Sequence, residues 1–141
     1  MTSNLGSEYI LEGNNNSYEL VMNTLKSTFR PEFINRIDEI IVFNSLSKEV
    51  VNDIIDKLIQ DLETRLSDKH IKLALTESAK KYILDNAYDE NYGARPIKRF
   101  ISNTVENLIA KSIINDEIKP NVTITIDVEN NELILKNVID I

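Results

Sequence analysis

The sequence predicts an α+β domain in which helices pack against a small sheet of about three strands. Three observations lead to this fold class: apolar residues recur at helical spacing after Ser47, apolar and polar residues alternate over residues 71–75, and a second alternating run ends in an asparagine turn. The chain has 141 residues, of which 42% are hydrophobic, so it can bury the core of one globular domain.

Residues 1–46 contain elements that do not add up to a core. Residues 1–7 have no nearby partner strand and lead into a polar loop at residues 13–17. The pattern then predicts a helix over 18–29, a short helix over 31–36 that begins at a proline, and an apolar strand over 39–43. A single strand with short helices cannot close a core, so we expect residues 1–46 to be the end of another domain.

Residues 47–141 begin with the most regular helical pattern in the chain. Ser47 is a good N-cap, and Glu49 lies in the first turn, where the helix dipole favours an acid. We expect this helix to end near Asp68. Its apolar stripe consists of Val50, Val51, Ile54, Ile55, Leu58, Ile59, Leu62 and Leu66.

The remaining elements alternate between strands and helices. Residues 71–75 predict a strand, and Thr76 caps a helix that runs to about Asn86. A long helix is expected from Arg95 or Pro96 to Ile114, followed by a hairpin of residues 122–128 and 132–136. Two inward faces are predicted, one of Ala79, Tyr82, Ile83 and Ala87, the other of Ile97, Phe100 or Ile101, Val105, Leu108, Ile109 and Ile113.

Composition excludes several classes of function. The absence of cysteine removes disulfides and thiolate chemistry, and His70 is the only histidine, so no metal site is expected. The net charge of −7 disfavours nucleic acid and anionic membranes as partners. No run of apolar residues is long enough to cross a bilayer and no secretory signal is visible, so we expect a cytoplasmic protein.

Cations crowd the start of the long second helix, where the dipole disfavours them. Arg95, Lys98 and Arg99 lie in its first turns, and Gly93 just before them permits an unusual backbone conformation. A helix N-terminus with an arginine is suited to an anion such as phosphate. The alternative is that these cations pair with carboxylates of this acidic chain.

Arg36 is a second candidate, although Asp38 and Glu39 follow it at once and offer a local salt bridge. Arg30 is similar, and Asn4 alone indicates nothing. The sequence has only three glycines, no GxxxxGK(S/T) loop and no strand ending in an acid pair. Phosphoryl transfer needs a phosphate cradle and a magnesium site, so we expect this chain alone not to hydrolyse ATP.

Three runs together resemble the second AAA+ module of Clp unfoldases. They are MTSNLGS at residues 1–7, FRPEFINRIDEIIVF at 29–43 and YGARPIKR at 92–99, in matching order and separation. The first run is more similar to ClpB, the disaggregase, than to ClpC or ClpA. The resemblance implies that residues 1–46 end the large AAA+ subdomain and that 47–141 form the small C-terminal subdomain. It also places the phosphate loop, the acid pair and the pore loop before Met1.

The resemblance implies roles for individual residues. Asn4 corresponds to the sensor-1 residue that orients the attacking water, and Arg36 to the arginine finger that reaches into a neighbouring subunit. Arg95, with Gly93 and Ala94 before it, corresponds to the sensor-2 motif that contacts bound nucleotide.

For the parent protein the resemblance implies a hexameric ATPase that uses ATP or ADP with Mg²⁺. It would thread misfolded or aggregated polypeptides and work with a DnaK-type chaperone system. Two alternatives stay open at this point: the same region of a protease-linked ClpC- or ClpA-like unfoldase, and a non-catalytic assembly module.

Overall fold

The computed structural model describes residues 1–13, 15–89 and 91–140, with side chains described as far as Lys136. The chain divides into two compact units, Met1–Ser45 and Leu46–Ile141. Each unit is described by itself.

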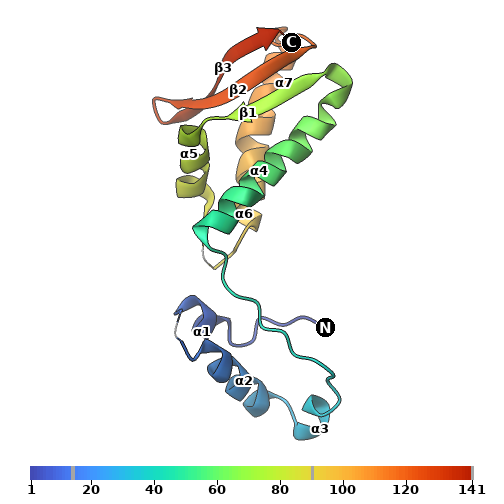
Figure 1. Ribbon diagram of the computed structural model, residues 1–141, viewed down its shortest axis with the longest axis vertical. Helices are drawn as coiled ribbons and strands as arrows, with labels where there is room; N and C mark the ends of the chain where they lie inside the picture. Colours follow the sequence, from blue (N-terminus) through green and yellow to red (C-terminus); the bar gives the residue numbers. More distant parts are fainter. Residues whose placement is uncertain (14, 90, 141) are drawn as a thin grey trace. The chain divides into compact units, whose positions relative to one another are not determined.

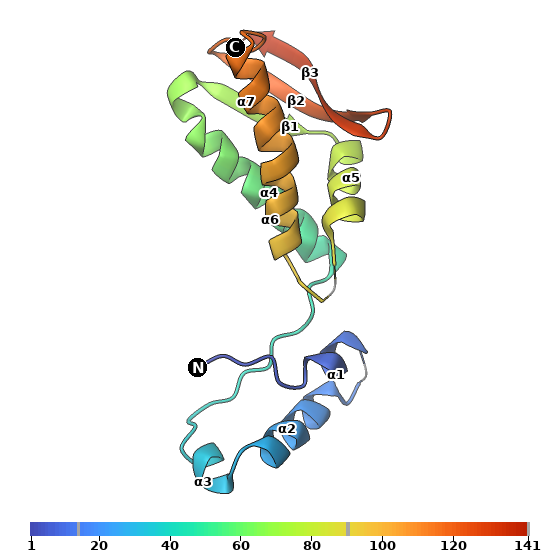
Figure 2. The same ribbon diagram turned by 180° about the vertical axis from the view of Figure 1, so that it is seen from behind.

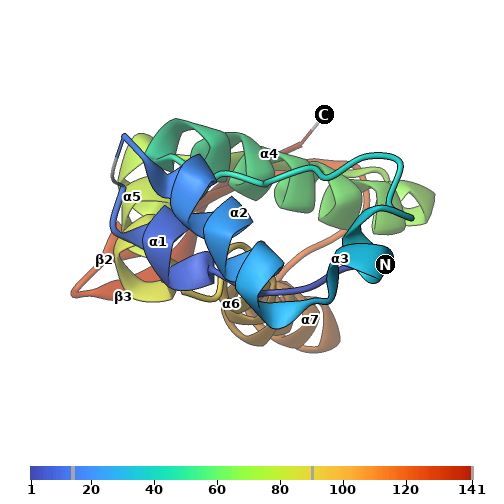
Figure 3. The ribbon, with the colours of Figure 1, turned by 90° about the horizontal axis from the view of Figure 1, so that it is seen from below.

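The first unit is helical. It contains α1 (Ser7–Leu11), α2 (Ser17–Thr28) and α3 (Pro31–Ile34), and α1 contacts α2, as Figure 3 also shows. Gly6 has a φ of 74° and approaches Val21, which is buried on α2. The rings of Phe29 and Phe33 stack with centroids 4.8 Å apart. The helix predicted over 18–29 is confirmed within one residue, α1 was not predicted, and α3 ends before Arg36.

The strand predicted over residues 39–43 is wrong. These residues are irregular, and the side chains of Ile41 and Phe43 are 67% and 80% exposed. A strand requires a neighbour to bond with, and the described residues of the first unit contain no second strand. The residues are apolar, but no strand among the described residues of this unit pairs with them. The polar loop predicted at 13–17 includes residue 14, which lies outside the described residues.

In the second unit, helices cover one face of a three-stranded sheet (Figure 1). The strands β1 (Ile71–Leu75), β2 (Val122–Glu129) and β3 (Glu132–Asp140) stand in the order β1-β2-β3. β1 pairs with β2 in parallel, from Ile71 opposite Val122 to Leu75 opposite Ile126, and β2 pairs with β3 antiparallel. The β2–β3 turn uses Asn130 and Asn131, both with positive φ, which is the geometry of a two-residue hairpin. The α+β prediction is confirmed.

The first helix of this unit is α4 (Lys48–Arg65), which Ser47 caps as predicted by accepting a hydrogen bond from the Val50 N–H at 3.3 Å. α4 ends before Asp68, and a short 3₁₀ turn (Ser67–Lys69) follows. Val51, Ile55, Ile59 and Leu62 form its buried stripe. Val50 was expected inside, but it is 44% exposed because it lies on the edge of the stripe beside the cap.

Next, α5 (Glu77–Ala87) is capped by Thr76 and buries Ala79, Ile83 and Ala87. The long second helix runs from Arg95 to Ile114 as predicted, but it is interrupted. It consists of α6 (Arg95–Ile101), the π-helical turn Ser102–Glu106 and α7 (Asn107–Ile114). Figure 2 shows these segments as one continuous helix beside α4.

The core lies between the three helices and the inner face of the sheet. Its fully buried members include Val51, Ile55, Ile83, Ile97, Val105 and Ile126. A smaller cluster of Ile71, Ile118, Val122 and Ile124 fills the end where β1 and β2 begin. At about 1.5–3 kcal/mol for each fully buried aliphatic side chain, these contacts hold the helices to the sheet. They therefore fix the position of α6, the helix that begins at Arg95.

Candidate functional site

The loop before α6 is held by one aspartate. The carbonyl oxygen of Asp89 accepts hydrogen bonds from the N–H groups of Tyr92 at 3.2 Å and Gly93 at 3.0 Å, and its carboxylate Oδ1 accepts from the Asn91 N–H at 2.8 Å. Asp89 and Gly93 also form an isolated antiparallel bridge. Sequence reasoning missed Asp89. The signal was present as an aspartate followed by Asn91 and Gly93, the residue types of a local turn.

Gly93 takes the left-handed conformation that its position requires. Its φ is 62°, and a Cβ there would meet only the Cδ1 of Leu46, at 3.8 Å. The requirement for glycine is therefore conformational rather than steric. Ala94 follows as the N-cap, with a φ of −85° and no side-chain capping bond, so among the described residues the first N–H groups of the helix have no side-chain acceptor.

Arg95 is the first residue of α6, and its side chain is exposed. Within the described part of the chain, the side chains of Arg95, Lys98 and Arg99 form no hydrogen bond or ion pair. The alternative that these cations are neutralised by carboxylates of the same chain is therefore not observed among these residues. The structure brings together a left-handed glycine, an uncapped helix start and an unpaired guanidinium.

The other two candidates lie in the first unit. Arg36 is exposed and follows α3, and its backbone N–H donates to the Phe33 carbonyl oxygen at 3.1 Å. Its side chain forms no ion pair with Asp38 or Glu39, the local partners that the sequence offered. Asn4 is exposed in the irregular segment before α1, and its carbonyl oxygen accepts from the Ser7 N–H at 3.2 Å.

The N-terminal end of the second unit is also hydrogen-bonded to the segment before this loop. The Tyr88 hydroxyl donates to the carbonyl oxygen of Leu46 at 2.9 Å, immediately before the Ser47 cap. This hydrogen bond therefore connects the segment before α4 to the segment that leads into the Arg95 loop. Tyr92, one residue before Gly93, is 71% exposed and adds an aromatic surface to this end of the unit.

The described residues do not provide a metal centre. No group of three or more His, Cys, Asp or Glu side chains suited to a metal ion occurs within the ranges 1–13, 15–89 and 91–140. None of the helices described there is both long and apolar enough to span a membrane. A surface hollow of about 710 Å³ lies beside His70 at the far end of α4. The 18 residues of α4 span about 27 Å, and the Arg95 loop lies near the other end of this helix.

Comparison with known proteins identifies the second unit. The family model of the C-terminal, D2-small domain, of ClpB protein matches residues 46–126. Chaperone protein ClpB of Bacillus anthracis is 44% identical over 142 residues, which cover 96% of this chain and 16% of that relative. ClpB of Malacoplasma penetrans is also 44% identical, over 97% of this chain and 19% of the relative.

Solved structures agree on the fold. The S. cerevisiae Hsp104–ADP complex aligns with a TM-score of 0.86 and 38% identity, over 97% of this chain and 25% of that chain. The extended S. cerevisiae Hsp104:casein complex aligns with a TM-score of 0.79 and 33% identity over the same shares. The chain thus spans a quarter or less of the proteins it resembles.

Proposed function

The chain belongs to the ClpB family of AAA+ disaggregase chaperones, and we propose that it forms the C-terminal part of the second AAA+ module of an ATP-driven protein disaggregase. The main support for this proposal is the position of Arg95. It presents an unpaired guanidinium at the start of the long helix, in the domain that the ClpB D2-small model matches. Similarity to the Hsp104–ADP complex supports nucleotide as the ligand. The ClpB relatives favour a disaggregase over a protease-linked unfoldase.

Arg95 serves as the sensor-2 residue, with Gly93 and Ala94 setting its approach. Bound ATP with Mg²⁺ would supply the phosphoanhydride whose hydrolysis drives the motor. The guanidinium presents several fixed donors to phosphate oxygens, and the uncapped N–H groups behind Ala94 add a partial positive charge. The Asp89 and Leu46 hydrogen bonds hold the loop, so Arg95 approaches the phosphate without a large cost in ordering.

Arg36 serves as an arginine finger toward a neighbouring subunit of a hexamer, and Asn4 orients the water at sensor 1. In related NTPases a finger arginine contributes about 10³–10⁵ in rate. Placing Arg36 in one subunit and the nucleotide in the next makes turnover depend on assembly. Support for these roles is the matching sequence runs and the exposure of both side chains.

The parent protein acts on misfolded or aggregated polypeptides together with a DnaK-type chaperone system. The Hsp104:casein complex supports a polypeptide substrate. Coupling follows from the location of Arg95 in a unit separate from Arg36: contact between Arg95 and phosphate would make the position of the small domain depend on the nucleotide. A cytoplasmic location stays a prediction from the sequence.

Two substitutions in the full-length parent test the proposal. We expect Arg95→Ala to weaken nucleotide affinity and turnover, and Arg36→Ala to reduce turnover by at least about 10³ with affinity retained. Lys111→Ala, an exposed cation at the other end of the same helix, is the control and should change neither. Normal nucleotide affinity and turnover in Arg95→Ala would favour the non-catalytic assembly module. The 141-residue chain alone should show no ATPase activity above buffer.

A further inference from the structure

β1 has a free edge. It stands at one end of the order β1-β2-β3, so β2 occupies one of its sides and no described strand occupies the other. Backbone groups of successive residues in a strand point to opposite sides. The Thr76 N–H donates to the Ile126 carbonyl oxygen in β2 at 3.0 Å, so the backbone groups of Ile71, Leu73 and Leu75 point away from the sheet. An unpaired edge of this kind is a template for another strand.

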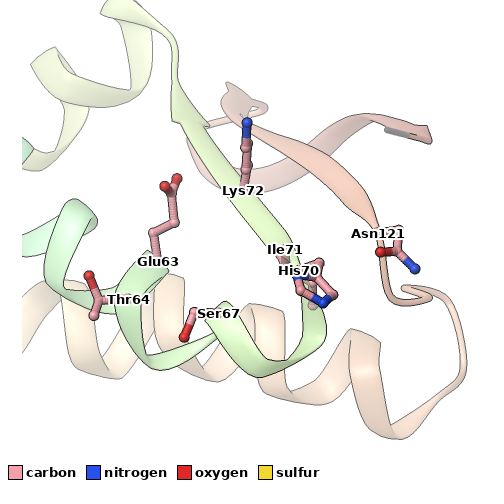
Figure 4. A pocket seen from close by; sticks show the side chains of 7 residues that line it. All are labelled: Glu63, Thr64, Ser67, His70, Ile71, Lys72 and Asn121. Carbon is pink, nitrogen blue, oxygen red and sulfur yellow. The ribbon is translucent and has the colours of Figure 1, made fainter.

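A carboxylate from α4 occupies the middle of that edge. Oε2 of Glu63 accepts a hydrogen bond from the N–H of Leu73 at 2.8 Å, in a partly buried position. Figure 4 shows Glu63 extending from α4 toward β1, on the far side of the hollow from His70 and Asn121. A second hollow continues along the strand, between Asp56 and Gln60 of α4 and residues 73–75. Glu63 lines both hollows, so it interrupts an open groove beside β1.

The edge of β1 is complementary to itself. If two copies of β1 pair antiparallel about Leu73, each Leu73 faces the other, Ile71 faces Leu75, and Lys72 faces Ala74. No like charges oppose one another, and apolar residues meet on the inner face. Such a pair is two-fold symmetric, which is the commonest arrangement of a homodimer. Its central hydrogen bonds require the Leu73 N–H, the group that Glu63 holds.

We propose that the free edge of β1 is a self-association surface for a second copy of this chain, and that Glu63 keeps it closed by binding the Leu73 N–H. Hollows lie on either side of Glu63, and its hydrogen bond to the Leu73 N–H is the contact that a pairing strand would have to displace. Natural proteins protect edge strands with charged residues in this way.

The test compares self-association of the 141-residue chain and its variants by sedimentation equilibrium. Glu63→Ala removes the acceptor, and we expect the dimer dissociation constant to fall by about tenfold or more, since a hydrogen bond to a charged group opposes pairing in the wild type. Glu63→Gln keeps an acceptor oxygen but loses the charge, so its dimer dissociation constant should lie between those of wild type and Glu63→Ala. Exchange of the Leu73 amide proton at low concentration should be faster in Glu63→Ala than in either.

A double variant locates the contact. Ala74→Lys in the Glu63→Ala background places an ammonium group opposite Lys72 of the other copy twice, so the added association should disappear. Circular dichroism establishes that each variant is folded. If Glu63→Ala does not fold, Glu63→Asp, which keeps the charge but is shorter by one methylene, takes its place. If folded Glu63→Ala, or Glu63→Asp in its place, associates no more tightly than wild type, the proposal is overturned, as it is if Ala74→Lys leaves the added association unchanged.

Discussion

Arg65 and Glu106 join the end of α4 to the π-helical turn through two parallel hydrogen bonds. Nη1 of Arg65 donates to Oε1 of Glu106 at 2.7 Å, and Nη2 donates to Oε2 at 3.3 Å. The Ser102 hydroxyl donates to the same carboxylate at 3.0 Å. Glu106 therefore links two helices and also spans the turn that interrupts one of them.

The Arg65–Glu106 pair predicts a pH dependence of stability. The Arg65 hydrogen bond, followed by the one from Ser102, lowers the pKa of Glu106 below its ordinary 4.5. A carboxylate with a lowered folded pKa contributes stability above its unfolded pKa, and this contribution is lost as the pH falls through the folded pKa. We expect Glu106→Gln to remove a few tenths to about 1 kcal/mol at pH 7, because the pair is largely exposed.

Urea unfolding at pH 7 and at pH 3 measures that effect. The difference between wild type and Glu106→Gln should shrink toward pH 3. Asp61→Asn, which breaks only the exposed Lys57–Asp61 pair, is the control and should change little at either pH. A Glu106→Gln deficit of the same size at both pH values would show that packing, not charge, is what Glu106 contributes.

Thr76 predicts a larger capping effect than Ser47. Its hydroxyl accepts from the Ala79 N–H at 3.1 Å and donates to Oδ1 of Asp127 at 2.7 Å, whereas Ser47 only accepts, from Val50 at 3.3 Å. Losing a cap costs about 0.5–2 kcal/mol, and Thr76→Ala also leaves a partly buried carboxylate short of a donor. In thermal unfolding, Thr76→Ala should therefore lower the Tm more than Ser47→Ala does.

The same variant has a local readout in Asp127. The Thr76 hydrogen bond is the main cause of the lowered pKa of Asp127, ahead of the bond from the Val128 N–H. Titration by NMR should show this pKa rising toward its ordinary 3.8 in Thr76→Ala and staying low in Thr76→Ser. An unchanged pKa in Thr76→Ala would contradict the assigned hydrogen bond.

The second unit could be predicted from sequence because its signals are local. Ser47 and Thr76 are caps, the stripes of α4 and α5 have helical period, and the two asparagines fit the hairpin turn. The strand over 39–43 failed because strand formation depends on a partner that the pattern does not encode. The order β1-β2-β3 was not predicted either, since pairing between distant strands is not visible in a local window.

The spacing of the apolar residues in the sequence already indicates the π-helical turn. Ile97, Ile101, Val105 and Ile109 are all buried and are spaced by four residues. On a regular helix of 3.6 residues per turn, each such step drifts by about 40°, so the stripe would leave the core. The wider turn at Ser102–Glu106 absorbs this drift. Arg95 and Gly93 could be found from sequence because cations at the start of a helix are unusual. Asp89 was missed because it acts mainly through hydrogen bonds to its backbone carbonyl oxygen.

The buried stripe of α6 predicts strong sensitivity at Ile97. This side chain is fully buried, and Ile97→Ala should cost about 2–5 kcal/mol, since it removes packed methylenes and leaves a cavity. Val50→Ala, also an aliphatic truncation in a first helical turn, should cost much less because Val50 is 44% exposed. Urea unfolding of the two variants makes the comparison, and similar losses would mean that Val50 packs in the core after all.

Gly93 predicts that asparagine is a better replacement than alanine. Its φ of 62° disfavours residues with a Cβ, and a left-handed conformation costs about 1–2 kcal/mol outside glycine. Asparagine adopts this region more readily, as Asn130 and Asn131 of this chain do. The nearest contact of a new Cβ is Leu46 at 3.8 Å, so size is not the obstacle. We therefore expect the free energy of unfolding in urea to be highest for wild type, lower for Gly93→Asn and lowest for Gly93→Ala.

A matched comparison is Gly6→Ala, because Gly6 also has a positive φ but its new Cβ would lie 3.1 Å from Cγ2 of Val21. This close contact should loosen α1, and amide exchange in α1 should then be faster. If Gly93→Ala is as stable as wild type, the loop before Arg95 does not hold the left-handed conformation in solution.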